Sequence, residues 1–433
     1  MSMLEHVPVA VLGAGLTGLS AGLDLERRRV GYRVFERSNQ VGGHAVTSEE
    51  AGYRFDRTGH LLHLRSEALK AEVLEWLEGD CLSIERRSVV FSHGVYTRYP
   101  FQSNTLGLPP EVAYECLLGF LSTLSAPRHE PAENFEQFCL QHFGPGFSRH
   151  FMLPYNSKLW GVPASEITPA WCQRFVPLPR LEDVVAGAVG LGAAKLGYNA
   201  NFLYPRRGIG ALPAAMRARV SNVELGSTPR QIHAAKRELE FENRRVRYDV
   251  LISTAPLPAL LAAFDQLPPE VASAAASLRC TPLYYFDLAL HGPALRDFHW
   301  AYVPEEKYPF YRVGCYSHFS PDMAPPGKAT LYVELAARSV PDVTAALEPV
   351  SRGLIEMGVI ADSAQIAFAR LRRLDHAYVI YDHAYDAALS VIRPFLESLR
   401  IIAAGRYGGW NYSSMEDALL FGREAAAQST RLI

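Results

Sequence analysis

The sequence predicts an α/β protein that combines a Rossmann-like dinucleotide-binding domain, a helical insertion domain and an antiparallel β-sheet domain. Three observations predict this fold class. Residues 7–36 alternate strand, glycine turn, helix and strand, residues from about 107 to 196 carry helical patterning, and residues 283–335 contain successive strand-like runs. A length of 433 residues accommodates two or three such domains.

The N-terminal segment has the pattern of a βαβ unit. Val9-Ala10-Val11-Leu12 is an apolar run typical of a buried parallel strand, residues 16–25 are compatible with a helix, and Tyr32-Arg33-Val34-Phe35 is a second strand. The turn Gly13-Ala14-Gly15-Leu16-Thr17-Gly18 lies between strand and helix, where backbone N–H groups can contact a pyrophosphate. Glu36 ends the second strand, where its carboxylate can accept hydrogen bonds from a ribose diol.

The middle of the chain changes from helical to β patterning. Helices are expected at residues 111–124, 134–142 and 181–196, separated by Pro and Gly breaks. Residues 221–253 return to short β-patterned runs and end in an apolar strand, 248–253, suited to the interior of a parallel sheet. The chain is therefore expected to return to the first domain after the helical insertion.

The C-terminal part predicts a second sheet and then the last pieces of the first domain. Strands are expected at residues 283–290, 300–303, 310–316, 330–335 and 401–404, and helices near 344–357 and at 415–428. Residues 405–412 form a glycine-rich loop. We expect a discontinuous dinucleotide-binding domain (1–98, 205–280, 384–433), a helical substrate domain (99–204) and a sheet substrate domain (281–383).

Composition excludes several function classes. Forty-three Lys and Arg against 45 Asp and Glu give a net charge of −2, which disfavours broad capture of nucleic acid. The chain start has no leader-like pattern and the longest uncharged apolar stretch, 184–194, is too short for a membrane span, so a cytoplasmic protein is expected. The six cysteines contain no Cys-x-x-Cys pair, which predicts reduced thiols and no metal site.

A second glycine pair distinguishes a flavin site from a nicotinamide site. Val41-Gly42-Gly43-His44 follows the ribose-binding Glu36 and Arg37, and resembles the signature of FAD proteins of the glutathione-reductase and amine-oxidase type. The late loop Gly405-Arg406-Tyr407-Gly408-Gly409 lies between a strand and a helix, as in those flavoproteins. Two distant glycine loops therefore predict FAD as the cofactor.

Several further segments resemble the UDP-galactopyranose mutase family, in order along nearly the whole chain. They are Phe55-Asp56-Arg57-Thr58-Gly59-His60, Tyr99-Pro100-Phe101-Gln102, residues 154–163, Tyr204-Pro205-Arg206-Arg207-Gly208, Pro309-Phe310-Tyr311-Arg312, Asp375-His376-Ala377-Tyr378 and residues 405–410. The resemblance implies a flavin-dependent isomerase that interconverts the pyranose and furanose forms of a UDP-sugar. In that family N5 of reduced FAD attacks the anomeric carbon, so no Ser-His-Asp set is required.

The resemblance also implies roles for individual residues. Arg174 and Arg312 match the two arginines that hold the diphosphate, and His60 matches the histidine beside the flavin. The implied substrate-binding residues are Tyr99, Phe101, Gln102, Phe151, Asn156, Trp160, Arg174, Asn199, Tyr302, Arg312, Tyr378 and Tyr412. The implied cofactor-binding residues are Gly13, Gly15, Leu16, Thr17, Gly18, Glu36, Arg37, Gly42, Gly43, His44, Gly59, His60, Val223, Gly405, Arg406, Tyr412, Ser414 and Met415.

Three departures from the family pattern concern the substrate. Phe319 stands where a phosphate-binding tyrosine is usual, Ser414 where an acid is usual, and Thr58 where a glycine is usual. They admit a nucleotide-sugar other than UDP-galactose. The resemblance leaves open a reductant such as NAD(P)H and a homo-oligomer. Two alternatives remain: an FAD-dependent oxidoreductase of the amine-oxidase or desaturase type, and a non-catalytic flavin-binding or sugar-nucleotide-binding scaffold.

Overall fold

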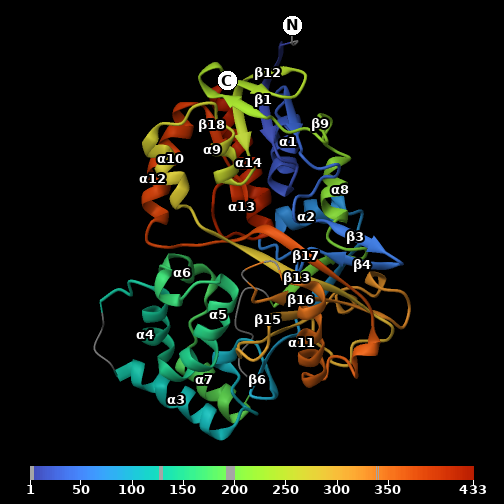
Figure 1. The fold of residues 1–433 in the computed structure, drawn as a ribbon, viewed down its shortest axis with the longest axis vertical. Helices are drawn as coiled ribbons and strands as arrows, with labels where there is room; N and C mark the ends of the chain where they lie inside the picture. Colours follow the sequence, from blue (N-terminus) through green and yellow to red (C-terminus); the bar gives the residue numbers. More distant parts are fainter. Residues whose placement is uncertain (1–3, 126–129, 192–199, 338, 340) are drawn as a thin grey trace.

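The computed structural model describes residues 4–433 except 126–129, 192–199, 338 and 340, and leaves the side chains of Gln173 and Arg174 undescribed. Three units are visible in Figure 1. A sheet with flanking helices lies at the top together with both chain ends, and a helical unit and a second sheet lie side by side below it. Within the described ranges, no helix combines the length and the apolar character needed to cross a membrane.

The first sheet has a parallel core in the order β9-β2-β1-β12-β18, extended by an antiparallel pair, β11 and β10. Its strands are β1 (Leu4–Leu12), β2 (Tyr32–Phe35), β9 (Val223–Glu224), β10 (Gln231–His233), β11 (Glu238–Glu240), β12 (Arg245–Ser253) and β18 (Ile401–Ala403). Strands β1, β2, β12 and β18 end at one edge, where ligands of such sheets bind. The glycine loops predicted to hold the cofactor follow β1 and β18 at that edge.

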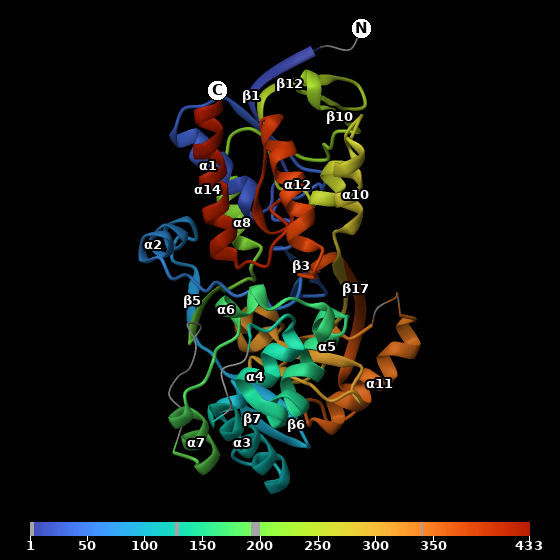
Figure 2. The same cartoon turned by 90° about the vertical axis from the view of Figure 1, so that its left-hand side faces the viewer.

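Helices cover both faces of this sheet, because alternate residues of β1 are buried on opposite sides. Val9 and Val11 pack in the core with α1 (Leu16–Arg27) and α14 (Met415–Leu432), while Ala10 and Leu12 belong to the core of the other face. The remaining helices around this sheet are α2 (Glu67–Trp76), α8 (Ala211–Arg217), α9 (Leu257–Ala262), α10 (Pro269–Ser277), α12 (Tyr385–Ser398) and α13 (Gly405–Gly408). In Figure 2, α1 and α14 lie on one side of the upper unit, and α12 and α10 lie on the other.

The helical unit fills one side of the lower half (Figure 1). Its elements are the short turn η1 (Phe101–Ser103), α3 (Pro110–Ser125), α4 (Phe135–Phe147), the π-helical turn η2 (Ser148–Met152), α5 (Leu153–Trp160), α6 (Cys172–Phe175) and α7 (Leu181–Val189). The expected helix 181–196 ends earlier, at Val189. Gly190 adopts a left-handed conformation (φ 78°), which ends helices.

The second sheet has the order β17-β13-β16-β15-β14-β6-β7. Its strands are β6 (Ser88–Ser92), β7 (Val95–Arg98), β13 (Cys280–Leu290), β14 (Trp300–Tyr302), β15 (Phe310–Cys315), β16 (Ala329–Leu335) and β17 (Ile366–Val379), and α11 (Val343–Glu356) lies beside them. The hairpin β6–β7 was expected in the first domain. It belongs to this sheet instead, because β6 pairs with β14 in parallel.

Two short ribbons complete the fold. Strands β3 (Thr47–Glu50) and β4 (Tyr53–Asp56) form one, and β5 (Cys81–Glu85) and β8 (Asn201–Pro205) form the other. Asp56 at the end of β4 is buried and accepts hydrogen bonds from the hydroxyls of Thr47 and Tyr204, both at 2.6 Å, and from the backbone N–H of Ile209 at 3.1 Å. This carboxyl group therefore fixes the start of the segment that leads to His60.

Candidate active site

The glycine loop after β1 has a backbone that only glycine can form. Gly13 has a φ of 96°, and its N–H donates to the carbonyl of Phe35 at 2.8 Å. A Cβ atom at Gly18 would lie 1.9 Å from the carbonyl oxygen of Gly13. The second glycine pair packs on this loop, because the N–H of Gly42 donates to the carbonyl of Ala14 at 2.8 Å. The two predicted cofactor segments are therefore one surface at the N-terminus of α1.

Glu36 is buried beneath that surface. Its Oε2 accepts the backbone N–H of Ala14 at 2.7 Å and its Oε1 accepts that of Ser38 at 2.8 Å. A carboxylate has further lone pairs for a ligand hydroxyl. Among the other residues predicted here, Arg37 is exposed, and Val223 lies in β9 opposite Val34 of β2.

The late glycine loop lies against the first one. A Cβ atom at Gly405 would lie 2.6 Å from the hydroxyl of Thr17 in α1. Arg406 donates to the carbonyls of Ser413 at 2.7 Å and Ala377 at 2.9 Å, and its guanidinium lies 4.6 Å from the ring centroid of Tyr412. This cation therefore lies between the late loop and β17 of the second sheet.

His60 faces the same region. Its Nδ1 is buried and has no hydrogen-bond partner among the described residues. Burial lowers the pKa of His60 to about 4, and the positive charge of Arg406 acts in the same direction, so the imidazole is neutral at pH 7. Thr58 has a left-handed φ of 68°, which glycine adopts more easily than threonine. A Cβ at the neighbouring Gly59 would lie 2.6 Å from the hydroxyl of Tyr332.

His44 and Tyr407 lie on the other side of this junction. The Tyr407 hydroxyl is 3.1 Å from Nδ1 of His44. Burial lowers the pKa of His44 to about 3, and the positive charges of Arg57 and Arg406 act in the same direction. Both histidines are thus neutral side chains in a positively charged surrounding, which favours a ligand with negative charge.

The second sheet contributes a row of side chains at directly opposed positions. Tyr302 of β14 pairs with Arg312 of β15, Arg312 with Glu334 of β16, and Glu334 with Tyr285 of β13. Directly opposed residues point to the same face of a sheet. Sequence spacing alone could not reveal this row, because it depends on the register of four strands.

Arg312 and Glu334 form a bidentate ion pair. Nε donates to Oε2 at 2.9 Å and Nη2 to Oε1 at 2.6 Å, while Nη2 also reaches the hydroxyl of Tyr378 at 3.4 Å. The Glu334 side chain has no solvent exposure and that of Arg312 is 20% exposed. Although burial opposes the charge, Glu334 raises the pKa of Arg312 well above its usual range. The guanidinium therefore stays charged and its orientation is fixed.

Aromatic side chains of the helical unit pack against tyrosines near this cation. The ring of Trp160 lies 5.6 Å from that of Tyr378 and 5.8 Å from that of Tyr412, and the ring of Tyr155 lies 5.2 Å from that of Tyr302. Burial raises the pKa of Tyr302 and Tyr378, so both phenols remain hydrogen-bond donors. The ring of Tyr302 also lies against that of Tyr99 in a tilted arrangement, with centroids 4.8 Å apart, and Phe101 stacks on Phe151 at 5.1 Å.

Some predicted substrate residues use their polar groups within the protein. Nε2 of Gln102 donates to the carbonyl of Pro177 at 2.9 Å, and Nδ2 of Asn156 donates to that of Met152 at 2.7 Å. The side chain of Arg174 and the whole of Asn199 lie outside the described residues. Their predicted contacts with substrate therefore stay predictions.

The three departures from the family pattern lie in different surroundings. Ser414 caps α14, since its hydroxyl accepts the N–H of Asp417 at 3.2 Å, and Met415 begins that helix. Phe319 is buried against Phe202 and other aromatic side chains, with ring centroids 5.8 Å apart. Phe319 therefore has a packing role in this structure, and Thr58 is the departure closest to His60.

Three residues of this region, Glu334, Tyr332 and Tyr155, are not among those predicted from the sequence. A lone carboxylate inside the otherwise apolar and aromatic run of β16 was a usable signal, since buried carboxylates are almost always paired. Tyr332 lies across Gly314, where a Cβ atom would come within 2.1 Å of its ring. No sequence signal marks that contact.

Nowhere in the described part of the chain do three or more His, Cys, Asp or Glu side chains gather as a metal site requires.

The whole chain is similar to known flavin-dependent proteins. Residues 16–428 match the flavin-containing amine oxidoreductase family. The structure is similar to that of a reduced UDP-galactopyranose mutase, with a TM-score of 0.92, 25% identity, and coverage of 99% of this chain and 96% of that one. A redesigned putrescine oxidase (TM-score 0.69, 15% identity, 99% and 100% covered) shares the fold. So does a CLA-producing fatty acid isomerase from P. acnes (TM-score 0.67, 14% identity, 98% of each chain covered).

Proposed function

The chain belongs to the flavin-containing amine oxidoreductase family. Within this family, we propose that it is a flavin-dependent isomerase that interconverts the pyranose and furanose forms of a UDP-sugar. The observation that carries the proposal is Arg312, which Glu334 fixes beside Tyr378, whose ring lies 5.9 Å from the guanidinium of Arg406 in the late glycine loop. A diphosphate needs such a cation, and an amine or apolar substrate does not. The 25% identity to a UDP-galactopyranose mutase over nearly both whole chains supports the same function.

The residues present fit a bound FAD. Three buried polar atoms at the junction of the loops have no partner among the described residues: Nδ1 of His60, Oδ1 of Asn411 and Oγ of Ser413. The turn 13–18 would hold the pyrophosphate, Glu36 the ribose, and the loop from Gly405 the flavin ring. When bound and reduced, the flavin supplies a nucleophile for the anomeric carbon.

The protein's own groups would then bind and orient the substrate. Among the described residues, Nη1 of Arg312 has no hydrogen-bond partner, because Glu334 and Tyr378 contact only Nε and Nη2. That edge can donate to a phosphate oxygen, and the protonated phenols of Tyr302 and Tyr378 can donate to others. The aromatic rings around them exclude water, which strengthens these charge-assisted bonds.

His60 and Arg406 would act on the cofactor side. The neutral His60 can accept or donate one hydrogen bond without adding charge, while the Arg406 cation favours an anionic reduced flavin. Turnover on reduced flavin requires an electron donor, and we propose a reduced nicotinamide as its class. The six free cysteines agree with a reducing compartment.

A binding experiment tests this function. The purified holoprotein would be titrated with UDP while flavin absorbance and tryptophan fluorescence are recorded, since Trp160 lies in the proposed site. We expect saturable binding in wild type and in Arg98→Ala, which changes an exposed arginine on β7 as a matched control. Loss of binding is expected in Arg312→Ala. Equal UDP affinity in wild type and Arg312→Ala would exclude the diphosphate role, and flavin reduction by an amine without UDP binding would favour an oxidase.

A further inference from the structure

A buried lysine outside the proposed site joins the helical unit to the second sheet. Lys158 on α5 donates from Nζ to the carbonyls of Phe310 at 2.7 Å, Glu305 at 2.8 Å and Val303 at 3.2 Å. The carbonyls of Val303 and Glu305 lie in the segment that connects β14 to β15, and Phe310 is the first residue of β15. An ammonium group has three donors, so this arrangement matches a donor to each carbonyl.

Nearby carboxylates compensate the charge of this lysine only in part. Lys158 as a whole residue is only 7% exposed. Burial lowers the pKa of Lys158 to about 7, whereas the carboxylates of Glu305 and Glu306 raise it. Removing the ammonium would leave three inward-facing carbonyls without their donor. Hydrogen bonds that involve a charged group are among the stronger ones in proteins.

The elements joined by Lys158 carry the two sides of the proposed substrate site. Tyr155 and Trp160 flank it on α5, and Tyr302 and Arg312 flank the connecting segment on β14 and β15. The rings of Tyr155 and Tyr302 meet at 5.2 Å across this junction. A change in the position of α5 would therefore change the distance between the aromatic wall and the cation.

A second set of contacts holds the same segment from the hairpin β6–β7. The backbone N–H of His93 donates to Oε2 of Glu305 at 3.0 Å, and Nε2 of His93 lies 3.2 Å from Nδ1 of His150. His150 belongs to η2, the turn that leads directly into α5. Buried or half-buried polar contacts therefore connect the second sheet to α5 itself and to the turn that precedes it.

We propose that Lys158 is a positioning residue that holds α5 against the β14–β15 connection and so sets the distance between Trp160 and Arg312 in the substrate site. This inference rests on the proposed function for its substrate, but the attachment of α5 by Lys158 is a property of the fold. The lysine acts through α5 and the connecting segment, and it does not itself contact the substrate.

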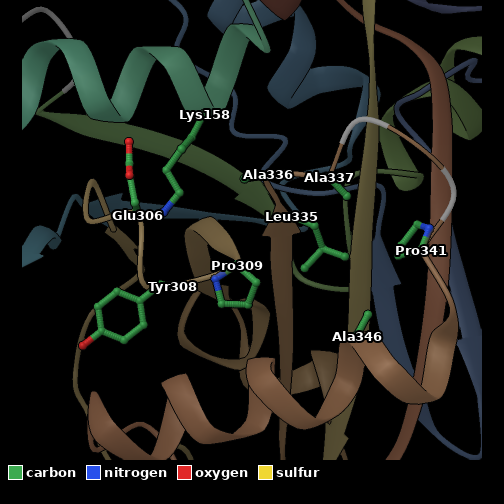
Figure 3. A pocket seen from close by; sticks show the side chains of 9 residues that line it. All are labelled: Lys158, Glu306, Tyr308, Pro309, Leu335, Ala336, Ala337, Pro341 and Ala346. Carbon is green, nitrogen blue, oxygen red and sulfur yellow. The ribbon is translucent and has the colours of Figure 1, made fainter.

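A cavity beside Lys158 makes a conservative replacement possible. It has a volume of about 380 Å³ and is lined by Lys158, Tyr308, Leu335 and Ala346 among others. In Figure 3, the Lys158 side chain extends from the green helix α5 toward Glu306, with the apolar wall to one side. The larger guanidinium of Lys158→Arg can use this space, so that variant should retain several of the donor contacts.

The test compares Lys158→Met, Lys158→Arg and Lys307→Met in the flavin-loaded protein. Lys307 is a matched control on the same segment, since it is 52% exposed and forms a surface ion pair with Glu356. For Lys158→Met we expect an unchanged flavin spectrum, a UDP Kd raised about tenfold or more, and faster amide exchange in residues 153–160 and 303–310. Lys158→Arg should recover most of both effects, and Lys307→Met should show neither.

The readouts separate this inference from the proposed function. Wild-type UDP affinity together with wild-type amide exchange in a folded Lys158→Met would overturn the positioning role. If wild type does not bind UDP at all, the proposed function fails, and amide exchange alone then decides whether Lys158 locks α5. If Lys158→Met does not fold, Lys158→Gln takes its place, because its uncharged amide has two N–H donors for three carbonyls. A raised UDP Kd and faster amide exchange in residues 153–160 are then expected, and wild-type values of both would contradict the positioning role.

Discussion

The buried ion pair between Arg312 and Glu334 gives a prediction in which stability and binding can be separated. The Glu334 carboxylate has no solvent exposure and accepts two hydrogen bonds from Arg312, at 2.9 Å and 2.6 Å. Arg312→Met removes both donors. Breaking a buried pair on one side costs about 3–5 kcal/mol. The free energy of unfolding of the holoprotein should fall by that amount in Arg312→Met.

Removing both charges should restore much of that stability. In Arg312→Met/Glu334→Leu no charge remains unpaired, and apolar replacements of buried pairs are often close to neutral in stability. We expect the double variant to be about 2–4 kcal/mol more stable than Arg312→Met. UDP affinity should fall in both variants by about 1.5–3 kcal/mol, which is roughly ten- to 150-fold.

The assay is urea unfolding of the four proteins of the cycle, combined with UDP titration of each. The fourth protein, Glu334→Leu, should be destabilised like Arg312→Met, because it leaves the arginine buried and unpaired. Strictly additive free energies across the cycle would refute the ion-pair argument. Normal UDP affinity in the stable double variant would refute the role of Arg312 in binding.

Three other changes test the cofactor junction and the sheet. Gly18→Ala should lower the ratio of flavin to protein absorbance, because its Cβ would lie 1.9 Å from the carbonyl of Gly13, and normal flavin content would contradict this. Gly314→Ala should reduce stability by about 1–3 kcal/mol in urea unfolding, because its Cβ would overlap the ring of Tyr332 at 2.1 Å; an unchanged midpoint would show that the ring can move. For His60, burial lowers the pKa to about 4, so unfolding lets the imidazole take up a proton between pH 4 and 6.5. The stability of wild type relative to His60→Gln should therefore fall as pH drops through that window and stay constant above about pH 7, whereas a difference that is flat in acid would contradict a depressed pKa.

Local features of the fold could be predicted from the sequence because they depend on residues close together in the chain. The turn 13–18 requires glycine for the φ of 96° at Gly13 and for the close backbone approach at Gly18. These requirements can be recognised from the glycine spacing of this one segment. The apolar strands β12 and β16 are recognisable for the same reason. The two glycine loops predicted FAD, and the family resemblance added the expected role of Arg312.

Features that depend on long-range pairing could not be predicted. Glu334 meets Arg312 only because β15 and β16 pair in one register, and a shift by one residue would place them on opposite faces. The hairpin β6–β7 joins the second sheet through its contact with β14, which lies about two hundred residues later in the chain. The packing role of Phe319 likewise depends on partners that the sequence does not place together.

The most direct test of the proposed function is the ring form of the sugar after incubation with the holoprotein. UDP-galactose and related nucleotide-sugars would be incubated with and without dithionite, and pyranose and furanose forms would be measured by NMR. We expect interconversion only with reduced flavin and no net oxidation of the sugar. Flavin reduction by an anaerobic substrate, with no change of ring form in any nucleotide-sugar, would contradict the isomerase and favour an oxidoreductase.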